Sequence, residues 1–221
     1  MIGVTRQATA AGDNSAALRR AMIDGQLRVS GVNDPVLLSA FAALPREDFV
    51  PAERRPAAYS DRSLSIGGNR FMPPPLSVGQ MLLEARPVAE DRALLIGGGT
   101  GYLAALVAPL VGSLDVVESE AALASAAPTQ AGRWTIGPLA QGAPDGAPYS
   151  LLLIDGAIEQ LPDTLVDQLD DDGRIVCGLI ERGVSRLAFG RKAAGRVSFL
   201  TVGDADFHPL EEFRLPRRWS F

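Results

Sequence analysis

The sequence predicts an α/β fold: a doubly wound, mostly parallel β-sheet with an antiparallel hairpin at its edge, preceded by an N-terminal helical segment. The apolar run Ala93–Ile96 is followed by a glycine turn and an alanine- and leucine-rich stretch, the usual opening of such a sheet. Two further apolar runs, Leu114–Glu118 and Ser150–Asp155, each end in an acid. Residues 186–191 and 197–202 flank a short turn and predict the edge hairpin.

Length and composition indicate a globular protein with a sizeable core. The chain has 221 residues, of which 47% are hydrophobic and 21% are charged. Because this length favours one domain, we expect residues 15–221 to form a single unit, with a helical and loop segment in 15–91 and a sheet in 92–221. Residues 1–14 are small and polar without periodicity, which predicts a disordered N-terminus.

The charge balance argues against nucleic acid as a principal partner, because a net charge of −5 and a pI near 5.0 do not attract phosphate backbones. Arg214, Arg217 and Arg218 form either a local basic patch or a solvated tail. No apolar run reaches the roughly 20 residues needed to cross a bilayer, so we expect no membrane partner and a cytoplasmic location. The sequence does not indicate an oligomeric state.

Metal and thiol chemistry have no visible basis in the sequence. The single cysteine, Cys177, lies in an apolar run and is expected to be a buried hydrophobic side chain. No group of histidine, cysteine and aspartate has the spacing of a metal site, so we expect no metal. The single histidine, His208, stands beside Pro209 in a charged tail, and we expect it at the surface and outside catalysis.

The first third of the chain carries two helix signals and one extended stretch. Apolar residues recur at helical spacing from Ser15, and Gly25 interrupts or ends this helix. Asn33-Asp34-Pro35 combines a capping side chain with a proline in the first turn, which predicts the start of a second helix. Residues 46–51 are charged and are expected to be extended.

The most specific chemical signal is a glycine loop after the first predicted strand. Its residues are Gly97, Gly98, Gly99, Thr100, Gly101 and Tyr102. Glycines at alternate positions let the chain turn sharply and let a ligand approach the backbone. A nicotinamide site requires G-x-G-x-x-G, whereas here the third glycine comes one residue early. This compact spacing indicates S-adenosylmethionine as the cofactor, although a glycine loop considered alone is also compatible with an ordinary tight turn.

Two acids at strand ends are candidate cofactor-binding residues. Glu118 ends the second strand, where a carboxylate can accept hydrogen bonds from both ribose hydroxyls, and the alternative is a solvated acid. Asp155 ends a third apolar run at the same carboxyl edge, where ligands bind in such sheets. Capping of the segment after Gly156 is the alternative role of Asp155, and the sequence does not decide between the two.

Several stretches, in order and from about Gln26 to the C-terminus, resemble the protein-L-isoaspartate O-methyltransferase family. They are Gly31–Leu37, Leu44–Pro51, Ala58–Asp61, Leu64–Gly67, Gly97–Tyr102, Ala147–Tyr149, Leu169 and Gly173–Val176. The resemblance implies a methyltransferase-type Rossmann sheet and S-adenosylmethionine as cofactor. It also implies methyl transfer to the α-carboxylate of isoaspartyl residues in damaged proteins, so that the partner is a protein or peptide substrate.

The chain departs from the family pattern at the substrate loop. Family members carry Thr-Ile-Ser-Gln-Pro there, whereas this chain has Phe71, Met72, Pro73, Pro74 and Pro75. Phe71 and Pro73 lack the hydroxyl groups of the family, and Pro73 and Pro74 also lack a backbone N–H donor. These replacements remove groups that would orient the substrate, and they argue for a changed acceptor.

Two family acids are absent as well. Leu95 stands where the family has a glutamate before the glycine loop, and Gly137-Pro138-Leu139 matches a Gly-Asp-Gly, so that an adenine-side acid is missing. We name no catalytic residue, because a carboxylate nucleophile is already anionic and needs in-line positioning more than an acid or base. The sequence therefore predicts a methyltransferase with altered or reduced activity, or alternatively a non-catalytic relative that binds the cofactor.

Overall fold

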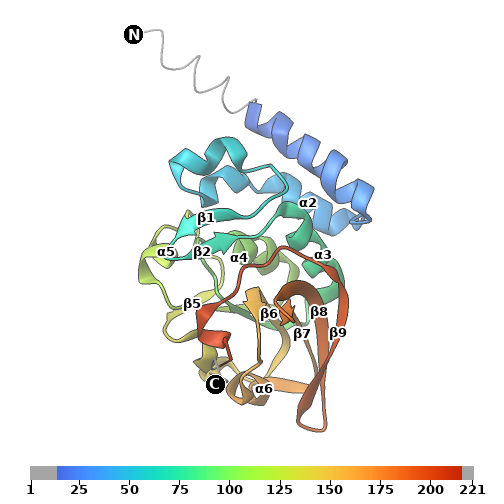
Figure 1. Cartoon of the computed structure of the whole chain (residues 1–221), viewed down its shortest axis with the longest axis vertical. Helices are drawn as coiled ribbons and strands as arrows, with labels where there is room; N and C mark the ends of the chain where they lie inside the picture. Colours follow the sequence, from blue (N-terminus) through green and yellow to red (C-terminus); the bar gives the residue numbers. More distant parts are fainter. Residues whose placement is uncertain (1–13, 216–221) are drawn as a thin grey trace, which may run out of the picture.

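The computed structural model describes residues 14–215, and its central feature is a seven-stranded sheet (Figure 1). Its strands are β3 (Arg92–Ile96), β4 (Ser113–Glu118), β5 (Arg133–Ile136), β6 (Tyr149–Ile158), β7 (Leu169–Glu181), β8 (Val184–Ala193) and β9 (Arg196–Asp204). The order is β5-β4-β3-β6-β7-β8-β9. Neighbours from β5 to β7 are parallel, and β8 and β9 continue the sheet as antiparallel strands. The predicted fold is confirmed.

Helices flank this sheet, and a two-stranded sheet lies beside it. The helices are α2 (Pro35–Ala43), α3 (Pro75–Ala85), α4 (Tyr102–Val107), α5 (Ala121–Ser125) and α6 (Asp163–Asp167). The small sheet is β1 (Leu64–Gly67) paired with β2 (Arg70–Met72). The shorter helical turns are η1 (Ile23–Leu27), η2 (Arg28–Ser30), η3 (Arg46–Phe49), η4 (Ala52–Ala57), η5 (Ala108–Leu110), η6 (Leu139–Gln141), η7 (Pro144–Gly146) and η8 (Glu211–Phe213).

The N-terminal helical segment follows the sequence signals closely. Residues 14–22 are α-helical and continue through η1 and η2 to Gly31, which has a φ angle of 91°. Gly25 lies inside η1, so it interrupts the α-helical pattern without ending the helix. Asp34 caps α2, because its carboxylate accepts hydrogen bonds from the backbone N–H groups of the helix's first turn. Our expectation for the first residues lies outside the described part of the chain, except at residue 14, which is helical.

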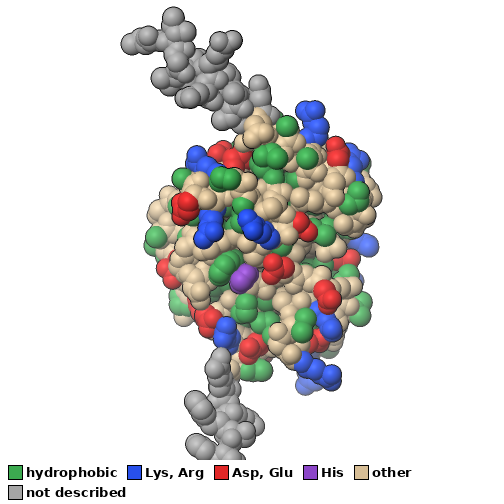
Figure 2. All heavy atoms as spheres, turned by 45° about the horizontal axis from the view of Figure 1, so that its top comes forward, with side chains coloured by type: hydrophobic (Ala, Val, Ile, Leu, Met, Phe, Trp, Pro, Cys, Tyr) green, Lys and Arg blue, Asp and Glu red, His purple; other side chains and the backbone are tan. Residues whose placement is uncertain are grey.

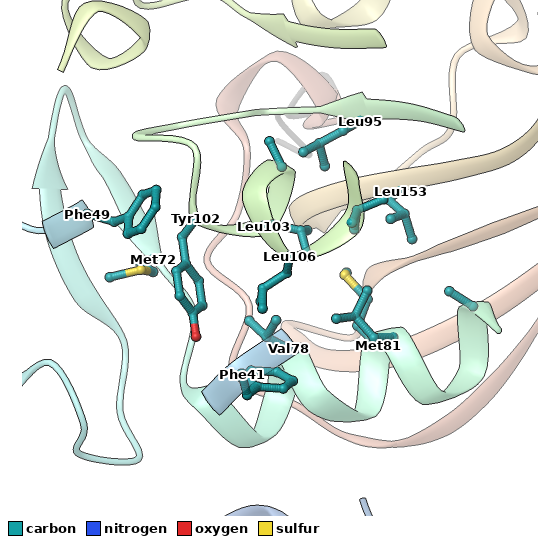
Figure 3. Packing of buried hydrophobic residues seen from close by; sticks show 14 of the residues in the cluster. Phe41, Phe49, Met72, Val78, Met81, Leu95, Tyr102, Leu103, Leu106 and Leu153 are labelled. Carbon is teal, nitrogen blue, oxygen red and sulfur yellow. The ribbon is translucent and has the colours of Figure 1, made fainter. Parts of the chain in front are cut away.

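The core lies on both faces of the sheet, which explains why β3 is apolar at successive positions. Leu95 points into a cluster with residues of α2, α3 and α4, whereas Leu94 and Ile96 point into a second cluster with α6 and η8. All three side chains are at most 1% exposed. Figure 3 shows the first cluster, where Val78 and Met81 of α3 face the sheet. A strand covered on both faces needs a continuous apolar run. Because β3 is held in place by this burial, the position of the glycine loop that follows it is fixed as well.

The hairpin of β1 and β2 lies against the glycine loop at the carboxyl edge of the parallel strands. A Cβ atom placed on Gly99 would lie 3.0 Å from Cδ1 of Ile66, and one placed on Gly68 would lie 3.4 Å from Cγ of Glu120. The first part of the chain therefore packs directly on the loop that the second part provides. This contact brings the predicted substrate loop, which begins at the end of β2, to the predicted cofactor loop.

The C-terminal segment returns from β9 to the same edge of the sheet (Figure 1). The backbone N–H of Ala157 donates to the carbonyl of His208 (2.8 Å), and the N–H of Leu210 donates to the carbonyl of Ala157 (2.9 Å). Pro209 thereby forms a parallel bridge to the end of β6. Residues 205–213 are thus held as an additional wall beside the carboxyl ends of the strands.

One expected element differs in the structure. Residues 46–51 were expected to be extended, but the first four form the 3-10 turn η3, and Arg46 within it is fully buried. The charge of Arg46 is held by backbone carbonyl groups, which local sequence patterns do not reveal. Among residues 14–215 no helix is long and apolar enough to cross a membrane. The same residues contain no group of three or more histidine, cysteine, aspartate or glutamate side chains suited to a metal ion.

Candidate cofactor and acceptor site

The glycine loop leaves little space for side chains, because other parts of the protein pack against both of its sides. Three of its glycines have positive φ angles, namely Gly97 (81°), Gly99 (53°) and Gly101 (91°). A Cβ atom on Gly98 would lie 2.8 Å from Cη2 of Trp134 on β5, and one on Gly99 would meet Ile66 of β1. Side chains at these two positions would push against the sheet or against the hairpin, so the packing accounts for the glycines that the sequence singled out.

Thr100 and Tyr102 anchor the loop to the η3 turn. The Thr100 hydroxyl donates to the carbonyl of Phe49 (2.6 Å), and the Tyr102 ring meets the Phe49 ring edge-on, with centroids 5.4 Å apart. Figure 3 shows Phe49, Met72 and Tyr102 together at one end of the core. Both loop side chains are buried. Their contacts fix the loop, and burial raises the pKa of the Tyr102 hydroxyl, so that it stays protonated as a hydrogen-bond donor.

Glu118 lies at the end of β4 and is completely buried. Its Oε1 accepts hydrogen bonds from Nη1 of Arg70 (2.8 Å) and from the backbone N–H of Glu120 (3.0 Å). Its Oε2 accepts from the N–H of Gly99 (2.6 Å) and from the same Arg70 nitrogen (3.1 Å). The solvated strand-end acid that we considered for Glu118 is therefore wrong, because this carboxylate ties β4, the glycine loop and β2 together.

Asp155 lies at the same edge, opposite the start of the glycine loop. Ile154, which precedes it, pairs with Ile96, the last residue of β3. The Asp155 Oδ1 atom is buried and has no hydrogen-bond partner among the described residues. Burial raises the pKa of this carboxyl to about 7, against the attraction of Arg70 and Arg46 and with a smaller contribution from Glu118. The structure thus holds an unsatisfied acid beside the loop.

Arg46 is a site residue that our sequence reasoning missed. It is fully buried, and its Nε donates to the carbonyl of Ala58 (2.8 Å) while Nη2 donates to the carbonyl of Pro73. The guanidinium carbon lies 4.7 Å from the centre of the Tyr102 ring. Its Nη1 has no hydrogen-bond partner among the described residues, and neither has the Tyr102 hydroxyl. No pattern distinguished this arginine from a surface charge, and only the family stretch in which it stands pointed to it.

The substrate loop presents one side chain to the surface. Phe71 is half-buried, whereas Met72, Pro73, Pro74 and Pro75 are buried. The Phe71 ring stacks on the ring of His208, with centroids 3.6 Å apart and an angle of 7° between the planes. The purple histidine in Figure 2 marks this place on the surface. His208 was expected at the surface and outside catalysis; it lies at the surface, where its ring stacks on Phe71 of the predicted substrate loop.

Glu212, in the C-terminal segment, lies next to Leu139. Leu139 belongs to the stretch after β5 in which the family has an acid that this chain lacks. Glu212 accepts a hydrogen bond from the backbone N–H of Leu139 through Oε2 (2.8 Å). Both residues line a cleft of about 300 Å³ together with Arg70, Glu120 and Leu210. This cleft opens beside the end of β4. The sequence patterns did not predict this hydrogen bond, because 73 positions separate Leu139 and Glu212.

The unpaired buried atoms fit one end of S-adenosylmethionine. A buried carboxylate oxygen of Asp155 lacks a donor, and two buried donors, Nη1 of Arg46 and the hydroxyl of Tyr102, lack an acceptor. Buried polar groups without partners are uncommon in folded proteins. An ammonium group and a carboxylate, the two charged groups of an amino acid, are the complements of these atoms. The residues that surround the glycine loop therefore fit the amino-acid end of the cofactor.

Comparison with known proteins identifies the family. The family model described as Protein-L-isoaspartate(D-aspartate) O-methyltransferase (PCMT) matches residues 18–214. The protein-L-isoaspartate O-methyltransferase of Koribacter versatilis is 37% identical over 202 residues, which are 88% of this chain and 91% of that protein. The enzyme of the same name from Methanoculleus marisnigri is 34% identical over 199 residues, covering 87% and 90% of the two chains.

Solved structures agree on the fold. One protein-L-isoaspartate O-methyltransferase superposes with a TM-score of 0.76 at 22% identity; the match covers 87% of this chain and spans about 65% of the length of that one. A Plasmodium falciparum protein crystallised with S-adenosyl-L-homocysteine superposes with a TM-score of 0.72 at 16% identity over 90% of this chain. The family model spans nearly all described residues, and relatives above 30% identity match over most of both chains. The chain belongs to the protein-L-isoaspartate O-methyltransferase family.

Proposed function

We propose that this chain is a protein carboxyl methyltransferase that takes its methyl group from S-adenosylmethionine and acts on isoaspartyl residues at a reduced rate. The observation that carries the proposal is the meeting of the glycine loop, Glu118 and the unpaired Asp155 at one edge of the parallel sheet. Family membership supports both the cofactor and the reaction. The replaced substrate loop supports the reduced rate.

The residues around the loop would hold the cofactor by its polar groups. Glu118 is suited to the ribose hydroxyls, Asp155 to the ammonium group, and Arg46 with Tyr102 to the carboxylate. S-adenosylmethionine, when bound, supplies an electrophilic methyl group on a positively charged sulfur. The buried aromatic and apolar walls next to the loop exclude water, which strengthens each of these charged contacts.

The acceptor side offers shape and stacking instead of hydroxyl groups. The half-buried pair of Phe71 and His208 borders the site with flat aromatic faces. Pro73 is buried and uses its carbonyl for Arg46, so that it adds rigidity and offers no hydroxyl. An acceptor carboxylate needs no base, and its rate of methylation depends on how well these walls orient it.

A non-catalytic relative that binds the cofactor is a second candidate function. The observation that favours it is the same stacked pair, since Phe71 and His208 cover the surface where the family's substrate loop carries hydroxyls. This candidate shares the cofactor with the first proposal. The two differ only in methyl transfer, so that one binding measurement and one transfer measurement separate them.

The function is tested by calorimetric titration followed by a methyl-transfer assay. We expect S-adenosylhomocysteine to bind and NAD not to bind, because the glycine spacing is the compact one. Radiolabelled methyl transfer is then measured on an isoaspartyl peptide, with the aspartyl peptide of the same sequence as control. Transfer only to the isoaspartyl peptide supports the enzyme. Binding without transfer to either peptide would leave the non-catalytic relative, and heat released by NAD alone would refute the cofactor assignment.

Binding of S-adenosylhomocysteine is expected to strengthen as the pH rises through about 7. Below that pH the buried Asp155 carboxyl is protonated and offers no charge to the ligand's ammonium group, because burial raises its pKa to about 7. The ionised fraction of such a group rises about tenfold between pH 6 and pH 8, so we expect Kd to fall by about that factor. Isothermal titration at several pH values measures it. Asp155→Asn should bind weakly at every pH, and an equal slope in this variant would contradict the assignment.

A further inference from the structure

Arg70 reaches from β2 into the centre of the candidate cofactor site. Its side chain is about 10% exposed and pairs with Glu118 at 2.8 Å. Its second terminal nitrogen, Nη2, donates to the carbonyl of Gly97 (3.0 Å). A Cβ atom on Gly97 would lie 2.7 Å from the same nitrogen, so the guanidinium rests directly on the first residue of the glycine loop.

The ion pair with Arg70 occupies the Glu118 carboxylate, which the proposed function assigns to the ribose hydroxyls. A carboxylate offers about four acceptor positions, and Glu118 receives four hydrogen-bond contacts. Two come from the backbone N–H groups of Gly99 and Glu120, and two come from Arg70. The backbone donors are fixed by the loop and by the end of β4. Ribose hydroxyls can therefore reach Glu118 only if Arg70 leaves.

The remaining contacts of Arg70 also coincide with those of the cofactor. Its charge attracts Asp155, whose Oδ1 has no partner, and its Nη2 occupies the carbonyl of Gly97. An arginine side chain here supplies a positive charge and several donors in a rigid plane. Arg70 thus donates to the Glu118 carboxylate and to the Gly97 carbonyl and attracts the unpaired Asp155, and these are the acceptors that an adenosyl amino acid would use.

We propose that Arg70 is an internal competitor of the cofactor, which closes the site until S-adenosylmethionine displaces it. The inference rests on the proposed function. The cleft of about 300 Å³ that Arg70 itself lines, next to Asn69 and Glu120, gives the displaced side chain a route to solvent. The site then exists in a closed form and an open form, and the population of the closed form lowers the apparent affinity for the cofactor.

Removal of the competitor should strengthen binding for two reasons. The open form no longer has to break the ion pair, and Glu118 in the free protein is left as a buried acid whose partner the ligand can supply. We expect Arg70→Gln to bind S-adenosylhomocysteine about tenfold or more tightly than the wild-type chain. Arg70→Lys keeps the positive charge but cannot contact Glu118 and Gly97 through two separate nitrogens. Its affinity for S-adenosylhomocysteine should therefore lie between those of the wild-type chain and Arg70→Gln.

The experiment is isothermal titration of S-adenosylhomocysteine into the full chain and its variants. Arg62→Gln is the matched control, because Arg62 is exposed and lies eight residues earlier in the same segment. Circular dichroism checks that each variant is folded. Since loss of the ion pair can unfold the glutamine variant, the side-chain Nε–H signal of Arg70 is also followed by NMR in the wild-type chain, where the ligand should shift it and hasten its exchange with water.

The outcomes separate this inference from the proposed function. Tighter binding in both Arg70 variants, with the control unchanged, supports the competitor. Binding in the variants but not in the wild-type chain also supports it, and shows that the wild-type enzyme is closed, against the proposed function. Equal or weaker binding in the variants, or an Arg70 signal that the ligand leaves unchanged, overturns the competitor while the cofactor assignment stands. Absence of binding in every chain overturns both.

Discussion

Replacement of Glu118 by glutamine is expected to lower the free energy of unfolding by about 3–5 kcal/mol, the usual cost of breaking a buried ion pair from one side. The Glu118 side chain is 0% exposed, and the partner charge of Arg70 is about 10% exposed. The variant would leave that guanidinium charged and without an acid next to the glycine loop. Equilibrium unfolding in urea, followed by circular dichroism, measures the loss through the midpoint and the slope.

Two further variants show whether the loss of stability comes from the buried ion pair. Glu120→Gln changes an exposed acid only two residues away and should cost less than about 0.5 kcal/mol, as surface substitutions do. The double variant Glu118→Gln/Arg70→Met removes both charges, so it should recover part of the stability that the single change loses. If the single variant lost no more than the Glu120 control, the buried pair would have no structural role.

Methyl transfer to an isoaspartyl peptide is expected to rise in the double variant Phe71→Thr/Pro73→Ser, which restores the hydroxyls of the family. A substrate carboxylate sheds water when it binds, and each hydrogen bond that it fails to regain costs about 1–3 kcal/mol. If this loss is felt in the transition state, each contact is worth roughly five- to 150-fold in rate. Radiolabelled transfer is compared between the wild-type chain, the variant and a family member that has the hydroxyls.

The matched control for this experiment is Phe199→Thr, which changes a half-buried aromatic ring on the remote edge strand β9. It should leave the transfer rate unchanged. Phe71→Thr removes the ring that stacks on His208, and Pro73→Ser frees the backbone next to the carbonyl that accepts from Arg46. Binding of S-adenosylhomocysteine is therefore measured in each chain. Wild-type activity equal to that of the family member would show that the hydroxyls are dispensable.

The parts of the site that the sequence predicts are those with a local pattern. The apolar run of β3, the glycines after it and the acid at the end of β4 all fall within residues 92–118, and each has a physical reason to be there. Asp34 and Pro35 mark the start of α2 for the same reason, because capping acts within one helical turn. Patterns of this kind predicted the sheet, its direction and the position of the glycine loop.

The missed residues act over long distances in the chain. Arg70 and Glu118 are 48 positions apart, and Arg46 reaches Pro73 across 27 positions. Arg46 stands in a charged stretch that is typical of a surface, and its burial depends on carbonyl groups of a turn and a loop. Only the packing of the hairpin on the sheet brings these charges together. Composition and spacing along the chain contain no record of that packing.

The wall formed by residues 205–213 comes late in the chain, and this limits when its contacts can form. The ribosome makes the chain from its N-terminus, so all seven strands precede His208 and Glu212 in synthesis. The parallel bridge from Pro209 can form only once its partner residue, Ala157 of β6, is in place. The contacts of this wall therefore form only after nearly all of the described chain has been made, because His208 stacks on a ring from the first third of the chain and Glu212 accepts from Leu139 across 73 positions.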